Sequence, residues 1–118
     1  TASLHFYTDV LGFQIMVRRS NPEFAYINLG EAQLMLEQYH AEGWNTAELI
    51  KPLGRGVNLQ IEVDDIEYVL ARVSKHGVPL YRDLRENTYQ IGETTACQRE
   101  FLVQDPDGYL LRFCQFVE

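Results

Sequence analysis

The sequence predicts an α+β domain built from two related modules, in which a helix is followed by three antiparallel strands. Three observations predict this class. The length of 118 residues fits one domain. The order of helix and strand patterns repeats in the two halves. The halves also share short similarities, because LGFQIM resembles HGVPLY and EFAYINLG resembles REFLVQDPDG.

The repeat predicts two βαβββ modules, the first of which lacks its leading strand in this chain. We expect half-modules over about 1–40 and 56–118, joined by a linker over about 41–55, within one domain covering 1–118. Such modules form a curved mixed sheet, with helices on one face and a concave ligand cavity on the other.

The first half has the pattern of one helix and three strands. Leu4, Tyr7 and Leu11 (or Val10) have helical spacing, Ser3 is the expected N-cap, and Gly12 ends the helix. Alternating apolar and polar residues then predict three strands joined by tight turns, over 13–19, 23–30 and 32–39.

The segment from 40 to 55 has no clean period and contains two glycines, one proline and the single tryptophan, so we expect a loop. A strand over 57–63 follows. Asp64 or Asp65 then caps a helix that ends at Gly77 and has an apolar face of Ile66, Val69, Leu70 and Val73.

The rest of the second half alternates strands with polar segments. We expect a short strand over 79–84, a polar loop over 86–95, and strands over 98–104 and 109–117 that flank the turn Asp-Pro-Asp-Gly. The aspartates of this turn are expected to accept hydrogen bonds from backbone N–H groups rather than to act in catalysis.

Composition excludes several classes of function. Seventeen acidic residues against 10 basic ones give a net charge of −7, which argues against nucleic acid and is compatible with a cationic partner. No apolar run approaches the roughly 20 residues of a membrane helix. Cys97 and Cys114 do not make a disulfide framework, so we expect free thiols in a reducing, cytoplasmic compartment.

Three segments together resemble the vicinal oxygen chelate superfamily, which includes glyoxalase I, extradiol dioxygenases, and fosfomycin and bleomycin resistance proteins. They are FYTDVLGF near the start, LQIEVDDIEYVLARV in the middle and REFLVQDPDGYLLRF near the end. The resemblance covers nearly the whole chain. It implies the two-module fold and, in the enzymes of the superfamily, a divalent metal held on the concave face.

The chain departs from that superfamily at the ligand positions. The resemblance places Asn58 where the second module usually has His, and Arg112 where Glu usually follows the DPDG turn. It places Met35 at the metal-ligand position on the last strand of the first half. Asn is a poor ligand for such metals and a guanidinium stays protonated. We therefore expect no metal, no other cofactor and no catalytic residues.

This departure favours a non-enzymatic protein of the bleomycin resistance branch. That resemblance implies an acidic homodimer that sequesters a bulky cationic glycopeptide antibiotic without chemistry, in cavities that two subunits can share. Two alternatives stay open. One is a metal-dependent enzyme of glyoxalase or dioxygenase type with an atypical site, and the other is a binder of another small aromatic ligand.

Strand alternation assigns candidate ligand-binding residues to the concave face. Carboxylates there would attract a cation, and flat rings would stack on an aromatic group. The candidates are Met35, Glu37, Tyr39, Trp44, Asn58, Gln60, Glu62, Arg112 and Cys114. Trp44 could instead pack at a dimer interface, and a polar loop over 86–96 could form a flap. The other interpretation is a solvated sheet face on which Glu37 or Glu62 pairs with Arg112.

Overall fold

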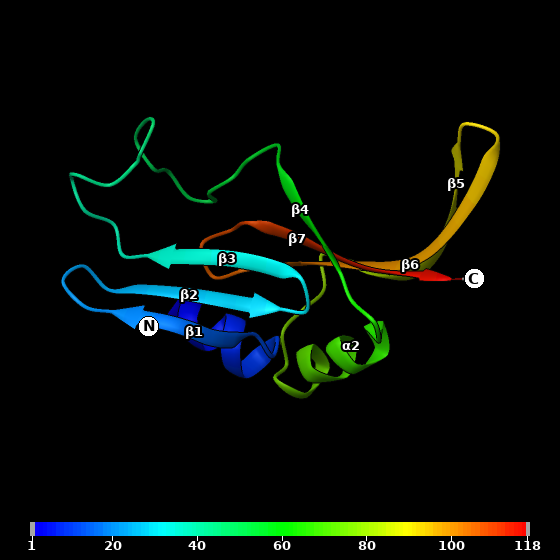
Figure 1. Cartoon of the computed structure of the whole chain (residues 1–118), viewed down its shortest axis with the longest axis horizontal. Helices are drawn as coiled ribbons and strands as arrows, with labels where there is room; N and C mark the ends of the chain where they lie inside the picture. The colour runs from blue at the N-terminus through cyan, green and yellow to red at the C-terminus, as the bar shows by residue number, and fades with distance from the viewer. Residues whose placement is uncertain (1, 118) are drawn as a thin grey trace.

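The computed structural model describes residues 2–117, and its first half forms an antiparallel sheet with one short helical segment (Figure 1). One helical turn and a π-helical turn come first, and three strands follow in the order β1-β2-β3. The elements are α1 (Ala2–His5), η1 (Phe6–Val10), β1 (Gln14–Arg19), β2 (Phe24–Leu29) and β3 (Ala32–Glu37). The predicted helix and three strands are confirmed.

The second half forms a four-stranded mixed sheet. Its strand order is β4-β7-β6-β5, in which β4 and β7 are parallel and the other pairs are antiparallel. The elements are β4 (Asn58–Glu62), α2 (Ile66–Lys75), β5 (Arg82–Ile91), β6 (Thr94–Gln104) and β7 (Leu110–Val117). This is a complete βαβββ unit, and the first sheet repeats its last three strands. The predicted α+β class is confirmed.

The helices cover the same side of both sheets, where the apolar core lies (Figure 1). Alternate residues of each strand point toward the helices and are buried, as a period of two requires. They include Ala25, Ile27, Ile61, Phe101, Val103, Leu111 and Phe113. We call the opposite side of each sheet its open face. The connector between β3 and β4 and the hairpin of β5 and β6 rise on that side.

Caps fix the ends of α2. The Asp65 carboxylate accepts a hydrogen bond from the Tyr68 N–H at 3.3 Å, so the predicted cap is confirmed. Gln115 of β7 adds a second acceptor for the Ile66 N–H at 2.9 Å. Ser3 is not the predicted cap of the first helix. It lies inside α1, and its hydroxyl donates to Asp107 at 2.9 Å, so that it joins the helix to the DPDG turn instead.

The polar loop expected over 86–95 is wrong, because these residues form the long hairpin of β5 and β6. Cys97 pairs with Val117 at the end of β7, so the hairpin continues beyond the third strand. Both of its faces are exposed there, and the alternation that marks a half-buried strand is therefore lost. The short strand expected over 79–84 starts at Arg82 and runs to Ile91.

Besides the bond from Ser3 to Asp107, two further polar contacts join the halves of the molecule. The Tyr7 hydroxyl donates to Asp105 at 2.6 Å in a buried position. Arg72 of α2 donates to the carbonyl oxygens of Val10 at 3.1 Å and Asp9 at 2.8 Å, where η1 ends. The halves are thus tied both at the DPDG turn and between their helices.

Within residues 2–117, no helix combines the length and the apolar character needed to cross a membrane.

Candidate functional site

The open face of the second sheet brings together five of the nine predicted site residues. Strand register places Asn58, Gln60 and Glu62 of β4 beside Leu110, Arg112 and Cys114 of β7, in that order. Directly paired residues of neighbouring strands share a face. The predicted clustering of Asn58, Gln60, Glu62, Arg112 and Cys114 on one face therefore agrees with the register.

A buried carboxylate lies at the centre of this face. Glu100 of β6 pairs with Cys114, and its side chain is only 7% exposed. Its two oxygens accept hydrogen bonds from four donors: Asn87 Nδ2 at 2.5 Å, Tyr89 Oη at 3.2 Å, Gln98 Nε2 at 3.2 Å and Arg112 Nε at 2.5 Å. A carboxylate with this many donors is stable despite its burial.

Arg112 is held on two sides. Besides its bond to Glu100, its Nη2 donates to the Tyr89 hydroxyl at 2.6 Å, and its guanidinium lies 5.8 Å from the centre of the Tyr89 ring. The hydrogen bond to Glu100 raises the pKa of the guanidinium above its ordinary value. The side chain keeps 25% of its surface exposed, so the charge remains accessible from the open face.

The expected partners of Arg112 are therefore wrong, because Glu100 rather than Glu37 or Glu62 pairs with it. Glu100, Tyr89 and Asn87 were absent from the predicted site. The sequence places Glu100 in a strand with alternating pattern, where it shares a face with Gln98. Strand alternation in the sequence could therefore have placed Glu100 on the open face. Asn87 and Tyr89 could not be placed there, because residues 86–95 were assigned to a loop.

Cys114 and Glu62 lie beside this network. Cys114 is fully buried on the open face, and burial, followed by the charge of Glu62, raises the pKa of its thiol. Glu62 itself is exposed, as are Asn58 and Gln60 on the same edge strand. β4 therefore contributes solvated polar groups, whereas β6 and β7 contribute a buried polar network.

The other four predicted site residues belong to the first half. Met35 and Glu37 lie on the open face of β3, and Met35 is 68% exposed. Glu37 Oε2 lies 3.1 Å from the Nε2 atom of His40. Tyr39 follows β3, and Trp44 is fully exposed in the connector. Neither of the two pockets described next includes any of these four residues.

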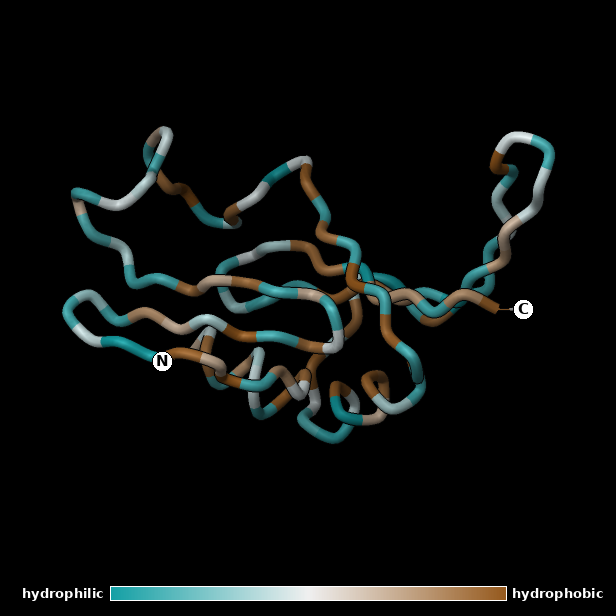
Figure 2. The backbone as a smooth tube through the Cα atoms, viewed as in Figure 1, coloured by the Kyte–Doolittle hydropathy of each residue, from teal (hydrophilic) through white to brown (hydrophobic). Residues whose placement is uncertain are grey.

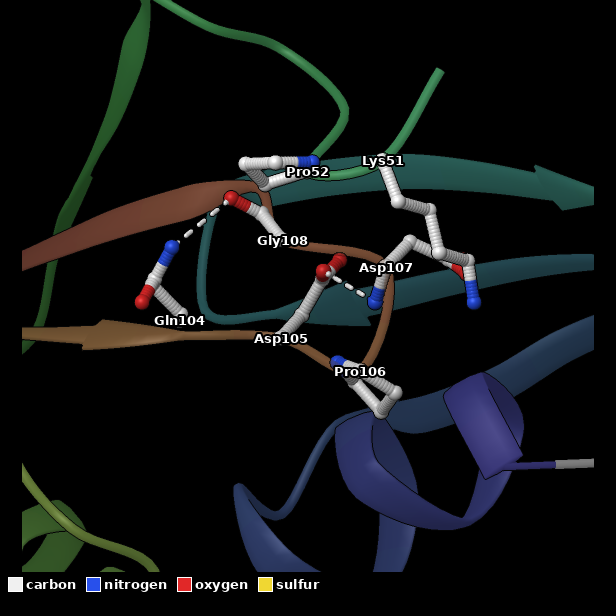
Figure 3. Close-up of a pocket in the computed structure, with 7 residues that line it drawn as sticks. All are labelled: Lys51, Pro52, Gln104, Asp105, Pro106, Asp107 and Gly108. Atoms are coloured by element: carbon white, nitrogen blue, oxygen red, sulfur yellow. Dashed lines mark hydrogen bonds and ion pairs between the residues drawn. The ribbon is translucent and has the colours of Figure 1, made fainter. Parts of the chain in front are cut away.

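Two shallow pockets lie at one end of the second sheet. The larger has a volume of about 350 Å³. It is formed by the end of the connector, from Pro52 to Val57, together with Tyr81 and the open-face residues Asn58, Gln104 and Leu110. A neighbouring pocket of about 290 Å³ lies against the DPDG turn (Figure 3). Asn58 is thus the predicted site residue that lines a cavity.

The predicted hydrogen bonds from backbone N–H groups to the DPDG turn are confirmed for Asp105, whereas Asp107 accepts from the Ser3 hydroxyl and pairs with Lys51. One oxygen of Asp105 accepts a hydrogen bond from the Asp107 N–H at 2.9 Å (Figure 3). The same oxygen accepts a second bond from the Tyr109 N–H at 2.9 Å. Gly108 adopts a φ of +101°, and a Cβ there would overlap Pro52 of the connector. The turn therefore packs closely against the chain that leads into β4.

The residues that the resemblance places at metal-ligand positions do not fit a divalent metal. Arg112 brings a positive charge there and Asn58 brings an amide, whereas such metals need imidazole or carboxylate donors. The three histidines are bonded elsewhere: His5 to Asp9, His40 to Glu37 and His76 to the Arg72 carbonyl. In the described part of the chain, no three His, Cys, Asp or Glu side chains gather as a metal site would require.

The chain is similar to known proteins over almost its whole length. A profile of the family described as the glyoxalase/bleomycin resistance protein/dioxygenase superfamily matches residues 1–113. A lactoylglutathione lyase from Neisseria meningitidis serogroup A is 31% identical over 96% of this chain and 80% of that protein. A bleomycin resistance protein from Geobacillus stearothermophilus is 27% identical over 98% of this chain and 88% of that protein.

A solved structure supports the fold. The integron cassette protein VCH_CASS1 from the mobile metagenome of V. cholerae superposes with a TM-score of 0.70 at 20% identity, covering 98% of this chain and 85% of that one. At that identity the likeness concerns the architecture alone.

Proposed function

The chain belongs to the glyoxalase/bleomycin resistance protein/dioxygenase superfamily, and from this premise we propose that its open face binds a small molecule without metal chemistry. One observation carries the proposal. Arg112, which the resemblance places at the position of a metal ligand, donates hydrogen bonds to Glu100 and Tyr89. A protonated guanidinium fixed at that position repels a divalent cation, but it can bind and orient an organic ligand.

The ligand that we propose is a cationic glycopeptide antibiotic of the bleomycin type, which the protein would sequester. Two observations support this choice: the 27% identity to a protein named bleomycin resistance protein, and the net charge of −7. Glu37 would attract the cation, and the exposed rings of Tyr39 and Trp44 would stack on its aromatic part. Sequestration needs affinity and no activated nucleophile, and a cytoplasmic location would suit it.

We further propose that the protein acts as a homodimer. The predicted site residues form two groups. The pocket around Asn58 lies at the second sheet, whereas the other group lies on β3 and in the connector that follows it: Met35, Glu37, Tyr39 and Trp44. A second copy that placed its first half over the second sheet would unite the two groups of site residues, and a two-fold axis would make two equivalent sites. Light scattering coupled to gel filtration would measure the mass, and a monomer at ligand-binding concentrations would contradict this arrangement.

Calorimetric titration with metal-free bleomycin tests the proposed ligand. Tight binding raises thermal stability, and a ligand at 100 times its dissociation constant contributes about 2.7 kcal/mol. Elemental analysis of the same sample belongs to the experiment. Saturable binding by metal-free protein is the expected result. No heat and no stabilisation at millimolar drug would eliminate this ligand.

The relative named lactoylglutathione lyase supports a second candidate, a lyase of related chemistry, because its identity of 31% exceeds that of the bleomycin resistance protein. The departure at Asn58 and Arg112 argues against it. Assays with the hemithioacetal of methylglyoxal and glutathione, in the presence of added Zn²⁺ or Ni²⁺, would decide. Turnover with stoichiometric bound metal would replace our proposal by this one.

A further inference from the structure

Three arginines gather on the open face of the second sheet. Arg112 of β7 pairs with Leu102 of β6, and Arg82 of β5 pairs with Leu102 from the other side. Arg85 of β5 pairs with Glu100. A bulge between Arg82 and Arg85 sets positions 83 and 84 of β5 against position 101 of β6, so both arginines share the face of Arg112.

The charge of this face is opposite to that of the chain. The open-face positions of β4 to β7 hold three arginines and two glutamates, Glu62 and Glu100, whereas the chain as a whole carries −7. Glu100 is buried beneath its four donors. The accessible charge over β5, β6 and β7 is therefore positive, in a protein with an excess of seven acidic residues.

The guanidinium of Arg112 presents one edge to a ligand. Its Nε–H and one N–H of Nη2 point to Glu100 and Tyr89. The other edge consists of Nη1 and the second hydrogen of Nη2, and within residues 2–117 Nη1 has no hydrogen-bond partner. That edge matches the two oxygens of a carboxylate or phosphate. Arg82 and Arg85 are exposed and, among the described residues, have no ion-pair partner.

The spacing suits one shared anion. Arg82 and Arg112 flank Leu102 on adjacent strands, so their Cα atoms lie about 10 Å apart. Arginine side chains are long enough to converge over that distance, and Leu102 between them brings no charge. The hydrogen bonds of Arg112 to Glu100 and Tyr89 also fix its position before a ligand arrives, which lowers the entropic cost of binding.

We infer that this face, defined by Arg82, Arg85 and Arg112, binds an oxyanion, carboxylate or phosphate, carried by the ligand. Tyr89 and Phe116 on the same face are 37% and 45% exposed, and their rings offer an apolar surface beside the arginines. The part of the ligand that contacts the second sheet is therefore an anionic group beside an aromatic or apolar body. The inference rests on the proposed small-molecule function. It adds that the second sheet recognises a negatively charged group of the ligand, whereas the proposed function assigned a positively charged one to Glu37.

Arginine side-chain NMR provides the test. The Nε–Hε signals of ¹⁵N-labelled protein would be followed during separate titrations with phenylacetate, inorganic phosphate and phenethylammonium, at constant ionic strength. We expect saturable shifts of Arg82, Arg85 and Arg112 with one or both anions, and none with the cation. A preference for phenylacetate would identify the carboxylate, and a preference for phosphate would identify the phosphate.

Variants keep the inference falsifiable without disturbing the buried network. Arg82→Gln with Arg85→Gln changes two exposed side chains and is expected to weaken anion binding about tenfold. Arg18→Gln is the matched control, because Arg18 is exposed on β1 of the first sheet, and it should leave the affinity unchanged. Shifts that do not saturate, or affinity that is equal in the double variant, would overturn the inference.

A bleomycin titration of the same variants separates the two proposals. If the drug binds but no anion does, the inference fails and the proposed function stands. If anions bind to the arginines but the drug does not, the inference stands and the glycopeptide is replaced by an anionic ligand.

Discussion

The two sheets share a strand order but differ in the chemistry of their open faces. In the first sheet that face holds Phe24, Tyr26 and Met35, and its side-chain hydrogen bonds lie among exposed groups, such as Tyr26 to Gln33 at 2.5 Å. In the second sheet it holds a buried carboxylate with four donors. Repetition of a backbone unit thus leaves side chains free to diverge, and only the second module has developed a rigid polar site.

Removal of the buried carboxylate should give the largest effect. Glu100→Ala leaves Arg112, Asn87 and Gln98 without their acceptor, so we expect a loss of about 3 kcal/mol in the free energy of unfolding. Urea denaturation measures it. The matched change on the first sheet, Gln33→Ala, removes an exposed side chain and should cost far less. Equal losses in the free energy of unfolding for the two variants would show that the polar network does not distinguish the open face of the second sheet from that of the first.

Tyr7→Phe tests the junction between the two halves. The change removes the hydroxyl bond to Asp105 but keeps the ring, and we expect a loss of about 1.5 kcal/mol. Denaturation followed separately by Trp44 fluorescence, which reports the connector, and by far-UV circular dichroism would show whether the halves still unfold together. If Tyr7→Phe is as stable as the unsubstituted protein, the bond from Tyr7 to Asp105 does not stabilise the junction between the halves.

The same tyrosine predicts a loss of stability at high pH. Burial, and then the bond to Asp105, raise the pKa of Tyr7 above its ordinary value of 10.0. Above that pH the unfolded chain releases the proton but the folded chain retains it, so stability falls by up to about 1.4 kcal/mol per pH unit. Below it Tyr7 contributes no pH dependence. Tyr7→Phe should show a smaller decline between pH 10 and 11.

Arg72→Leu tests the second contact between the halves. The variant loses the donors to the carbonyl oxygens of Val10 and Asp9, and we expect about 1 kcal/mol of destabilisation, because the site is partly solvated. Thermal denaturation at two salt concentrations is the measurement. Arg99→Leu, which removes a solvent-exposed ion pair with Glu67, provides a control that should cost less.

Trp44→Ala should have the smallest effect on folding. Its side chain is fully exposed, so the denaturation midpoint should not change measurably. Figure 2 shows hydrophobic stretches in the same connector, where Leu49 and Ile50 are 46% and 59% exposed. The affinity for the ligand, in contrast, should fall if Trp44 stacks on the ligand. The dimer should dissociate more readily if Trp44 packs at the dimer interface. A large loss of stability would contradict its placement in the open connector.

The sequence was sufficient for the fold because strand alternation, caps and turn residues are local signals. Asp65, Gly77 and the DPDG turn were all predicted in their observed roles. The β5–β6 hairpin was missed because its two exposed faces carry no alternation. The partner of Arg112 was missed for a related reason. Glu100 lies 12 residues from Arg112, and only the register of β6 and β7 brings the two together.

The length of the β5–β6 hairpin has a consequence for local opening. Beyond the pair Cys97 and Val117, each strand of the hairpin has a single neighbour, so amide groups there should exchange with solvent without global unfolding. Tyr89 lies in this outer part, yet its hydroxyl is bound to Arg112 in the well-protected part of the sheet. A ligand that binds the free edge of Arg112 keeps this bond and holds the arginine in place, so hydrogen exchange at residues 88–95 should decrease on binding.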